Sequence, residues 1–392
     1  MGLISQAKDI YIPKLRFSEF YDKWEVKSLL SVVSFRNGKP FETFVEENGK
    51  YKLITIDSVD INGKLKTKFK TVNQADGSLS KNDIIIVLSD IAHGYLLGRS
   101  CLIPENDTFV LNQRMGRLRP KQKDSAAFIS LYINNHQYFF RSRGQGTSQR
   151  HIYERDINQF EIKLPSTIEQ QKIAAFLTTI EDKLTVDENQ LDLLRKYKKS
   201  VVKKIFRQEI QFMNDANQPY PKWAEVKIGD ITQNYDNKRK PISSELRTAG
   251  EFPYYGANGV VDYVEDYIFN GEYVLVAEDG VVDISKYPVH FVRGKFWVNN
   301  HAHVLQGKDV DNIFLYYVLH STRFVKYITG SAQTKLNNQI LRSIKVTIPI
   351  DEGEQRKIAD FLSTIDAKIQ IEEAKLRESK KFRAALVQRM FV

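Results

Sequence analysis

A nine-residue stretch that occurs twice decides the fold. Glu169-Gln170-Gln171-Lys172-Ile173-Ala174-Ala175-Phe176-Leu177 returns 185 positions later as Glu354-Gln355-Arg356-Lys357-Ile358-Ala359-Asp360-Phe361-Leu362. Aligned without a gap over 169–206 and 354–391, 15 of 38 positions are identical, where chance would give about two or three. The sequence therefore contains an internal duplication.

Both copies have the spacing of a coiled-coil helix. Neither 169–207 nor 354–392 contains proline or glycine, and apolar residues recur at alternating intervals of four and three, which is the seam of a coiled coil. The predicted seam residues are Ile173, Leu177, Ile180, Leu184, Leu191, Leu194, Val201 and Ile205, and Ile358, Leu362, Ile365, Ile369, Leu376, Leu386 and Met390.

Charged residues interrupt the two seams at matching places. Acidic Asp187 and Glu372 occupy one seam position, and basic Lys198 and Arg383 occupy another. Polar seam residues set the register of coiled coils. We therefore hypothesise that the helices pair antiparallel, with the acidic interruption of one near the basic interruption of the other. The alternative is two separate core helices, each packed on its own domain.

Weaker echoes precede each copy and divide the chain. Gly146-Thr147-Ser148-Gln149 resembles Gly330-Ser331-Ala332-Gln333, and each leads to a proline, Pro165 or Pro349. The predicted boundaries are 1–168 for a first globular domain, 169–210 for the first helix, 211–353 for a second domain and 354–392 for the second helix. Strands are expected at 51–56, 83–88, 271–276 and 296–299, and helices at 126–138 and 313–326. The fold class is thus mixed α/β, with two pseudo-repeated domains separated by two long helices that form an antiparallel coiled coil.

Composition limits the class of protein. The chain has 392 residues, a net charge of +10 and a single cysteine, Cys101. One cysteine excludes a disulfide framework and fits a reducing compartment. The longest aliphatic run, 84–88, is too short for a bilayer, and the first residues lack the pattern of a signal peptide. These features predict a cytoplasmic protein without a membrane partner.

The positive charge favours a polyanion as partner, but it is unevenly distributed. Residues 1–168 contain 25 Lys and Arg against 18 Asp and Glu, whereas residues 208–353 contain 15 against 18. A nucleic-acid contact in the second domain must therefore depend on local basic clusters rather than on a general field.

A search for catalytic motifs gives little. The sequence has no P-loop and no Asn-Pro-Pro-aromatic motif of amino-methyltransferases. His301 and His303 would share one face of a strand, but no obvious further ligands complete a metal site. Glu161-Ile162-Lys163 resembles the end of a nuclease motif, yet it fits an ordinary strand before Pro165 equally well. No catalytic residue and no bound metal or cofactor are predicted.

Basic and amide-rich loops are the better candidates for a site. Arginine suits guanine, glutamine suits adenine, and hydroxyl groups suit phosphates. Each cluster alone could also be a solvated surface. The predicted DNA-binding residues are Arg114, Arg117, Arg141, Arg143, Gln145, Thr147, Gln149 and Arg150 in the first domain, and Lys238, Arg239, Lys240, Ser331, Gln333 and Lys335 in the second.

The whole layout resembles one known family, the specificity subunits of type I restriction-modification systems. The matching features are the opening Pro13-Lys14-Leu15-Arg16-Phe17 with Trp24 and its restart at Pro221-Lys222-Trp223. Others are the two Gly-(Ser/Thr)-x-Gln segments, the two Glu-Gln-x-Lys-Ile-Ala-x-Phe-Leu helices, and Tyr254-Tyr255-Gly256-Ala257-Asn258-Gly259 with the Asp262-Tyr263-Val264 that follows.

The resemblance implies a non-catalytic protein that binds double-stranded DNA. Each of two target-recognition domains would read one half of a bipartite sequence, and the paired helices would set the spacing and dock two modification (methyltransferase) subunits. S-adenosylmethionine is expected on those subunits, and ATP and Mg on a restriction (motor/nuclease) subunit that joins them. The alternatives are a coiled-coil scaffold that binds only protein and a stand-alone DNA-modifying enzyme.

Overall fold

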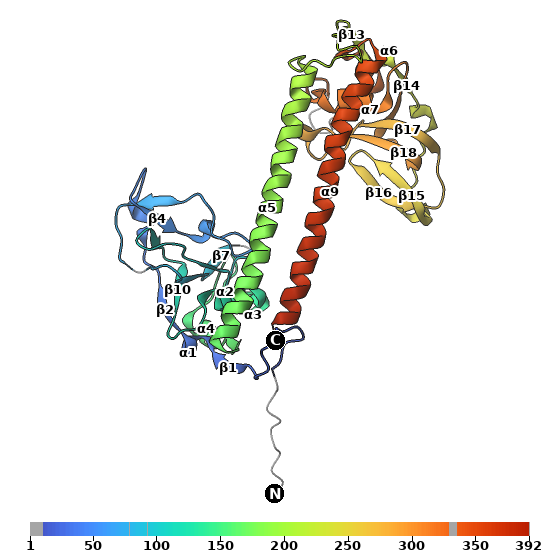
Figure 1. The fold of residues 1–392 in the computed structure, drawn as a ribbon. Coiled ribbons are helices and arrows are strands. Elements are labelled where there is room, and N and C mark those ends of the chain that lie inside the picture. Colours follow the sequence, from blue (N-terminus) through green and yellow to red (C-terminus); the bar gives the residue numbers. More distant parts are fainter. Residues whose placement is uncertain (1–10, 78, 92, 329–334, 392) are drawn as a thin grey trace. The chain divides into compact units, whose positions relative to one another are not determined.

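The computed structural model describes residues 11–77, 79–91, 93–328 and 335–391 (Figure 1). The chain forms two compact units, residues 1–186 with 376–392, and residues 187–375. Each unit thus contains one globular domain together with one half of each long helix. No helix within the described residues combines the length and the apolar character that a membrane span requires.

The first globular domain is built from short strands and four short helices. A four-stranded sheet in the order β2-β10-β6-β8 and a second in the order β3-β5-β4-β9 accompany the pairs β1-β12 and β7-β11. The strands are β1 Glu25–Ser28, β2 Val33–Asn37, β3 Val45–Glu46, β4 Tyr51–Ile54, β5 Lys70–Val72, β6 Ile84–Val87, β7 Ser89–Ile91, β8 Ser100–Leu102, β9 Phe109–Leu111, β10 Met115–Pro120, β11 Gln149–His151 and β12 Glu161–Leu164. The helices are α1 Leu29–Val32, α2 Ala126–Asn135, α3 Gln137–Arg143 and α4 Glu154–Asn158.

The second domain has a different main sheet but a similar pair of strands at its two ends in the sequence. Six strands follow the order β14-β19-β17-β18-β15-β16, and β13 pairs with β20 as β1 pairs with β12. The strands are β13 Ala224–Lys227, β14 Thr232–Asn234, β15 Ala249–Gly256, β16 Gly259–Val264, β17 Phe269–Ala277, β18 Val289–Val298, β19 Ala302–Gly307 and β20 Lys345–Ile348. The helices are α6 Ile228–Ile231, α7 Asn312–Ser321 and α8 Asn338–Ser343.

The two long helices, α5 Thr167–Phe206 and α9 Glu352–Met390, run antiparallel. In the first unit the beginning of α5 packs with the end of α9, and in the second the end of α5 packs with the beginning of α9 (green and red in Figure 1). With 40 and 39 residues, each is about 60 Å long. Every predicted seam residue is buried or half-buried. The fold class predicted from the sequence is confirmed, and the alternative of two separate core helices is wrong.

Two ion pairs cross between the helices at equivalent places. Lys198 lies 2.5 Å from Asp366 in the second unit, and Arg383 lies 2.5 Å from Glu181 in the first. The offset of 185 that relates the duplicated sequences converts one pair into the other. Both basic seam residues therefore reach across to the other helix, as hypothesised, but the carboxylates that they meet are Asp366 and Glu181, which flank the seam.

This arrangement gives a testable prediction. Because Lys198 and Asp366 are both half-buried, reversing one charge places like charges together in a partly desolvated site. Lys198→Glu should lower the melting temperature of the protein, and Lys198→Glu with Asp366→Lys should recover most of that loss. A thermal-denaturation double-mutant cycle measures the coupling, and simple additivity of the two single substitutions would contradict the pairing.

The motif at the start of each long helix ties that helix to its own domain. The side chain of Gln170 donates to the carbonyl of Pro165 at 3.0 Å and accepts from the backbone N–H of Ser125 at 2.9 Å. Gln355 makes the same two contacts with Pro349 and Asp311, at 3.0 and 3.4 Å. Ser125 and Asp311 cap α2 and α7, so the repeated glutamine joins a strand end, a helix cap and the coiled coil in both units.

Each globular domain packs against one side of the paired helices. If the seam positions are named a and d, Glu181 and Asp366 both occupy position e. Lys64 of the first domain contacts Glu181 at 3.7 Å, and the Tyr317 hydroxyl of the second donates to Asp366 at 2.7 Å. In an antiparallel pair, related positions of the two helices lie on the same side. In each unit, the globular domain therefore covers the e side of its own stretch of the helices.

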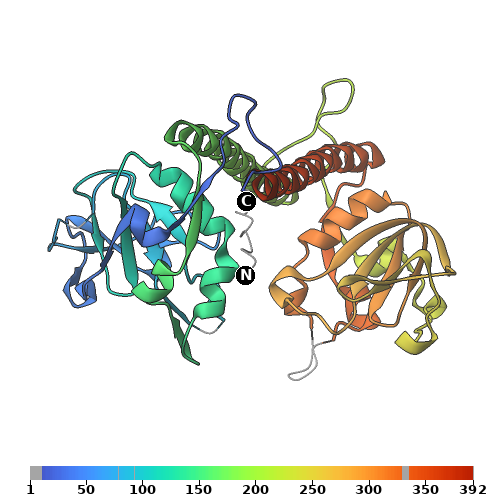
Figure 2. The same ribbon diagram turned by 90° about the horizontal axis from the view of Figure 1, so that it is seen from below.

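Two linking segments cover the ends of the opposite side. Phe17 packs on Phe176 with ring centroids 5.8 Å apart, and Phe212 packs on Phe361 at 5.9 Å. Phe176 and Phe361 are equivalent in the duplication and occupy position g. Figure 2 shows these segments, dark blue and yellow-green, on the side of the helices away from the strands of their own unit. Among the described residues, the g side beyond this contact is open in each unit: Val186 and Phe382 are exposed in the first, and Tyr197 and Ile371 in the second.

The short elements match the expectations unevenly. The strands expected at 51–56 and 83–88 are present as β4 and β6, and those at 271–276 and 296–299 lie within or overlap longer strands, β17 and β18. The helix expected over 126–138 divides into α2 and α3 at His136, and the one expected over 313–326 ends at Ser321, before a separate turn at 324–326.

Candidate nucleic-acid interface

The predicted site of the first domain forms one connected surface. Strand β11 pairs with β7, so that Gln149 lies opposite Ile91 and His151 opposite Ser89. Gln145 and His151 exchange two backbone hydrogen bonds of 2.9 and 2.8 Å. This brings together Arg141, Arg143, Gln145, Thr147, Gln149 and Arg150, all of them half-buried or exposed.

Glycine allows the tight return in this hairpin. Gly146 has a φ of +111°, and a Cβ there would lie 2.0 Å from the carbonyl oxygen of Gln149. The Arg150 guanidinium donates to the carbonyl of Gly144 at 3.1 Å. The hairpin is thus a defined structure, and Gln145 and Thr147 within it are exposed.

The other two predicted arginines of this domain are placed differently. The carbonyl of Arg114 accepts a 2.9 Å hydrogen bond from Leu88, directly before β7, and its side chain is exposed beside the hairpin's strand. Arg117 lies on β10, where burial and the charge of Arg119 lower the pKa of its guanidinium. Arg114 therefore belongs to the surface around β7, whereas Arg117 lies on β10 opposite Arg36 of β2.

The second domain brings fewer of the predicted residues to its surface. Lys238 and Lys240 are exposed. Lys335 is half-exposed and ion-pairs with Glu278 at 2.9 Å. Arg239 is only 14% exposed and contacts Glu278 at 2.7 Å and the carbonyl of Ala302 at 2.9 Å. Arg239 is therefore committed inside the domain rather than available to a ligand. Ser331 and Gln333 lie outside the described residues.

Two carboxylates lie close to His303, which makes this cluster the candidate for a metal site among the described residues. Asp236, Glu278 and His303 have ligand-type atoms within 4.8 Å of one another. Nδ1 of His303 faces Asp236 at 2.6 Å and Nε2 faces the carbonyl of Leu336 at 2.7 Å. Both ring nitrogens therefore face oxygen atoms of the protein, and neither is turned toward an open position. His301 lies apart, exposed and 2.5 Å from Asp279.

The cations of the protein itself neutralise these carboxylates. Burial alone would raise the pKa of Asp236 and of Glu278, but hydrogen bonds from His303 and Arg239, respectively, reverse that effect and hold both pKa values below their ordinary range. Lys335 adds a further ion pair to Glu278. The cluster is an internal ion network that fixes the backbone at Lys335 and Leu336.

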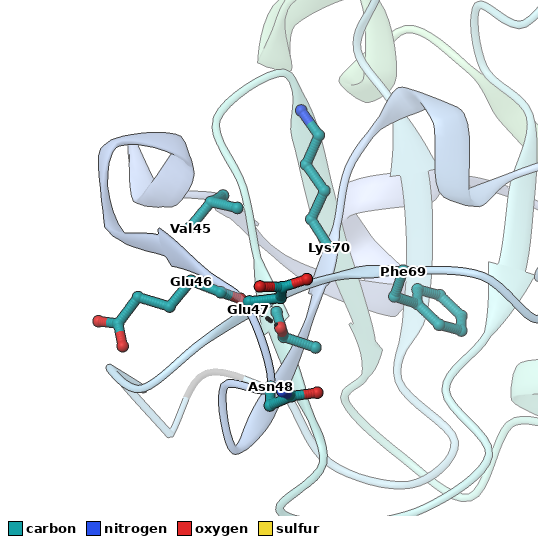
Figure 3. A pocket seen from close by; sticks show the side chains of 7 residues that line it. Val45, Glu46, Glu47, Asn48, Phe69 and Lys70 are labelled. Carbon is teal, nitrogen blue, oxygen red and sulfur yellow. Dashed lines mark hydrogen bonds between the residues drawn. The ribbon is translucent and has the colours of Figure 1, made fainter.

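A further hollow lies on the first domain, as Figure 3 shows. It measures about 440 Å³, is open to solvent, and is lined by Val45, Glu46, Glu47, Asn48, Phe69, Lys70 and Thr71. Its polar groups serve the local strands: Glu46 accepts from Thr71 through its carbonyl and from Asn73 through its carboxylate. The lining residues offer neither a nucleophile with an adjacent base nor a convergent ligand set.

Sequence reasoning missed one part of the first surface. His93 and Tyr95, in the loop that leaves β7, are exposed beside Arg141, whose guanidinium lies 4.8 Å from the centre of the Tyr95 ring. Their position a few residues after the apolar run at 84–88 was a weak signal in the sequence.

Comparisons with known proteins agree on one family. A family model described as "Type I restriction modification DNA specificity domain" matches residues 21–195 and again 220–380. The type I restriction enzyme MjaVIII specificity subunit of Methanocaldococcus jannaschii is 23% identical over 92% of this chain and 91% of its own length. A putative specificity subunit of Haemophilus influenzae, S.HindORF215P, is 40% identical over 35% of this chain, a match that spans 37% of that relative.

Solved structures share the fold. The S subunit of a type I restriction-modification system from M. genitalium aligns over 97% of this chain and 99% of its own, with a TM-score of 0.69 and 19% identity. A chain from a study of type I R-M complex assembly and conformational transition aligns over 94% of this chain and 97% of its own, with a TM-score of 0.51 and 15% identity. The two family matches occupy both pseudo-repeats, and the chain therefore belongs to the type I restriction-modification DNA specificity subunits.

Proposed function

We propose that the two domains of this chain each read one half of a bipartite sequence in double-stranded DNA, while the paired helices set the distance between the half-sites and dock two methyltransferase subunits. The observation that carries this proposal is the duplication itself. Equivalent anchors, Gln170 and Gln355, attach two dissimilar domains to equivalent stretches of the duplicated helices. An asymmetric bipartite target requires two different recognition domains that are attached to the helices in equivalent ways.

The basic hairpin of the first domain supports a role in DNA binding. A two-stranded ribbon fits the major groove, where guanidinium groups and amides read base edges. β7 and β11 form such a ribbon, and it carries Gln149 and Arg150 with Arg141 nearby. The second domain has fewer exposed cations, so we expect most of the salt dependence of DNA binding to come from the first domain.

The open part of the g side in each unit supports docking of protein partners. Val186 on α5 is 62% exposed and Phe382 on α9 is 60% exposed, both in the first unit. Ile371 and Tyr197, which are 65% and 52% exposed, are their equivalents in the second unit. These residues occupy heptad positions c and g, which neighbour each other on the side away from the domains. Each unit thus presents an aliphatic and an aromatic side chain from opposite helices.

The duplicated patches imply two copies of one partner. The ion pairs place Val186 and Phe382 within about one helical turn of each other along the pair, and likewise Tyr197 and Ile371. Apolar side chains exposed at equivalent places mark interaction surfaces. We propose the methyltransferase subunits as the occupants, because the chain itself brings together no catalytic group among the described residues.

The distance-setting role gives a prediction with a measured length. One heptad can be inserted into both helices, between Asn189 and Gln190 and between Ala374 and Lys375, where the two ion pairs place the centre of the pseudo-repeat. Seven residues preserve the seam and lengthen each helix by about 10.5 Å. The untouched spacer between the half-sites should grow by about three base pairs, at roughly 3.4 Å each.

Methylome sequencing of cells that carry this chain with its methyltransferase measures the spacer. The matched control is the same insertion in α9 alone, which breaks the pairing and should abolish methylation. An unchanged spacer in a functional double insertion would refute the distance-setting role. Methylation of DNA by the purified chain with S-adenosylmethionine alone would instead support a stand-alone enzyme.

A further inference from the structure

In both units, the loop that leaves an inner strand of the sheet lies next to residues that follow the Gly-(Ser/Thr)-x-Gln sequence along the chain. In the first, Ile152 donates to the carbonyl of Leu88 at 2.9 Å, and His151 pairs with Ser89. In the second, Leu336 donates to the carbonyl of Glu278 at 2.7 Å, and Lys335 pairs with Asp279. Strands β6 and β17 therefore bring the following loop next to His151 and Ile152 in one unit and next to Lys335 and Leu336 in the other, although the two sheets differ.

Hydrogen bonds to one buried side chain hold the described ends of the loop in the first unit. Asp90, only 6% exposed, accepts from the backbone N–H of Ile91 through one oxygen and from that of Leu96 through the other, both at 2.8 Å. Gly94 has a φ of +66°, and a Cβ there would lie 3.2 Å from the side chain of Arg150 in the facing hairpin. A loop fixed in this way loses little entropy on binding.

The loop of the second unit is held by a different residue. The side-chain amide of Asn258, in the turn between β15 and β16, donates to the carbonyl of Gly280 at 2.8 Å and accepts from the N–H of Val282 at 3.2 Å. The carboxylate of Asp90 in the first unit and the side-chain amide of Asn258 in the second therefore both hold a loop at equivalent places in the fold.

Each loop, together with the last residue of β7 in the first unit, exposes apolar or aromatic side chains. Ile91 is 68% exposed and Tyr95 is 51% exposed, with the ring of His93 5.4 Å from that of Tyr95. In the second unit Val282 is 87% exposed. Apolar groups contact the thymine methyl in the major groove, and ring N–H and hydroxyl groups hydrogen-bond base edges. The first loop also stands beside Arg141, whose cation suits the phosphates or guanine.

We propose that this loop is a base-reading element in each domain: Ile91, His93 and Tyr95 determine specificity in the first half-site, and Val282 does so in the second. The proposal rests on the proposed function and adds residues that the hairpin segments alone do not include. Since the two loops belong to different half-sites, a substitution in one serves as the control for the other.

The experiment uses the full complex with the methyltransferase, on the bipartite target found by methylome sequencing. Tyr95→Ala and Val282→Ser are compared with the unsubstituted protein on a panel of duplexes in which each base pair of the target is replaced in turn. Tyr21→Ala, another exposed tyrosine of the first unit, is the matched control. Melting curves establish that the variants are folded, as their exposure predicts.

Tyr95→Ala should weaken binding to the target about tenfold and flatten discrimination at one or more base pairs of the first half-site alone. Val282→Ser should flatten discrimination in the second half-site alone, and Tyr21→Ala should change neither. An unchanged profile in both loop variants, or a change in the opposite half-site, would overturn the inference. If the unsubstituted complex itself fails to distinguish its target from scrambled DNA, the proposed function fails instead.

Discussion

Replacing Glu169 by glutamine should destabilise the first unit strongly, whereas the same change at the equivalent Glu354 should leave the second unit as stable or make it more stable. Glu169 is 1% exposed and receives two hydrogen bonds of 2.7 Å from the guanidinium of Arg16. Removing one charge of a buried pair leaves the other uncompensated, which costs about 3 kcal/mol. The melting temperature should fall by roughly 6–12 °C.

Glu354 has no such partner in the described residues. Its Oε2 is buried without a hydrogen bond. The contact of Phe212 with Phe361 matches that of Phe17 with Phe176, so the place of Arg16 falls to Gln211, which is exposed. Burial therefore raises the pKa of Glu354, and the nearby indole of Trp223 offsets this only in part.

The sign of the pH dependence follows from this raised pKa. A carboxyl group whose pKa is higher in the folded than in the unfolded state contributes stability that is fully present below the unfolded value, about 4.5, and lost as the pH rises through the folded pKa. As the pH rises through this interval, the unsubstituted protein should lose stability that Glu354→Gln does not lose. The melting temperature of the variant should therefore rise relative to that of the unsubstituted protein, and the difference should become constant at higher pH.

Calorimetric scans of both variants from pH 4 to pH 8 test these two predictions. Because the two units need not melt together, each unfolding transition is fitted separately. Glutamine is close to glutamate in shape, so each variant controls the other for loss of volume. Equal destabilisation by the two substitutions at pH 7 would show that Arg16 does not distinguish the two copies of the motif.

The second large effect concerns the open g side of the helices. Val186→Glu with Phe382→Glu should remove one of two docked methyltransferase subunits, and Tyr197→Glu with Ile371→Glu should remove the other. Burying an unpaired carboxylate in an apolar contact weakens binding by roughly a hundredfold or more. Combining all four substitutions should leave the chain without either partner and abolish methylation.

Native mass spectrometry of co-expressed complexes measures the stoichiometry. Lys196→Glu with Lys381→Glu is the control, because it adds charges of the same sign at side chains that are 71% and 67% exposed and lie outside the patches. Loss of both partners from a single double substitution would indicate one shared site, and retention of both would refute docking at these patches.

Much of the helix pair could be predicted from the chain alone. The seam depends on a local spacing of three and four, which survives without knowledge of any other contact. The ion-pair partners of Lys198 and Arg383, in contrast, could not be predicted from the seam. Asp366 and Glu181 lie beside the seam rather than in it, and which flanking carboxylate a long basic side chain reaches depends on helix stagger.

The candidate site shows the same division. Arg141 and Arg150 stood out because basic, amide-rich loops are visible in composition. Arg239 also stood out, but it lies inside the domain, since composition does not distinguish a cation that pairs internally from one that faces solvent. His93 and Tyr95 were missed because their significance comes from the pairing of β7 with β11, which joins segments about sixty residues apart.

The sequence by itself determined the duplication, the two long helices and the spacing of their seams, because a repeat and a helical periodicity can be read directly from the order of the residues. Antiparallel pairing of the seams was a hypothesis that the structure confirmed. Only the tertiary structure decided which side of the helices the domains cover, which buried glutamate has an arginine partner, and which loops meet at each predicted surface. Those outcomes depend on contacts between residues distant in sequence, and their energies are set by burial and by the geometry of partners that no local pattern encodes.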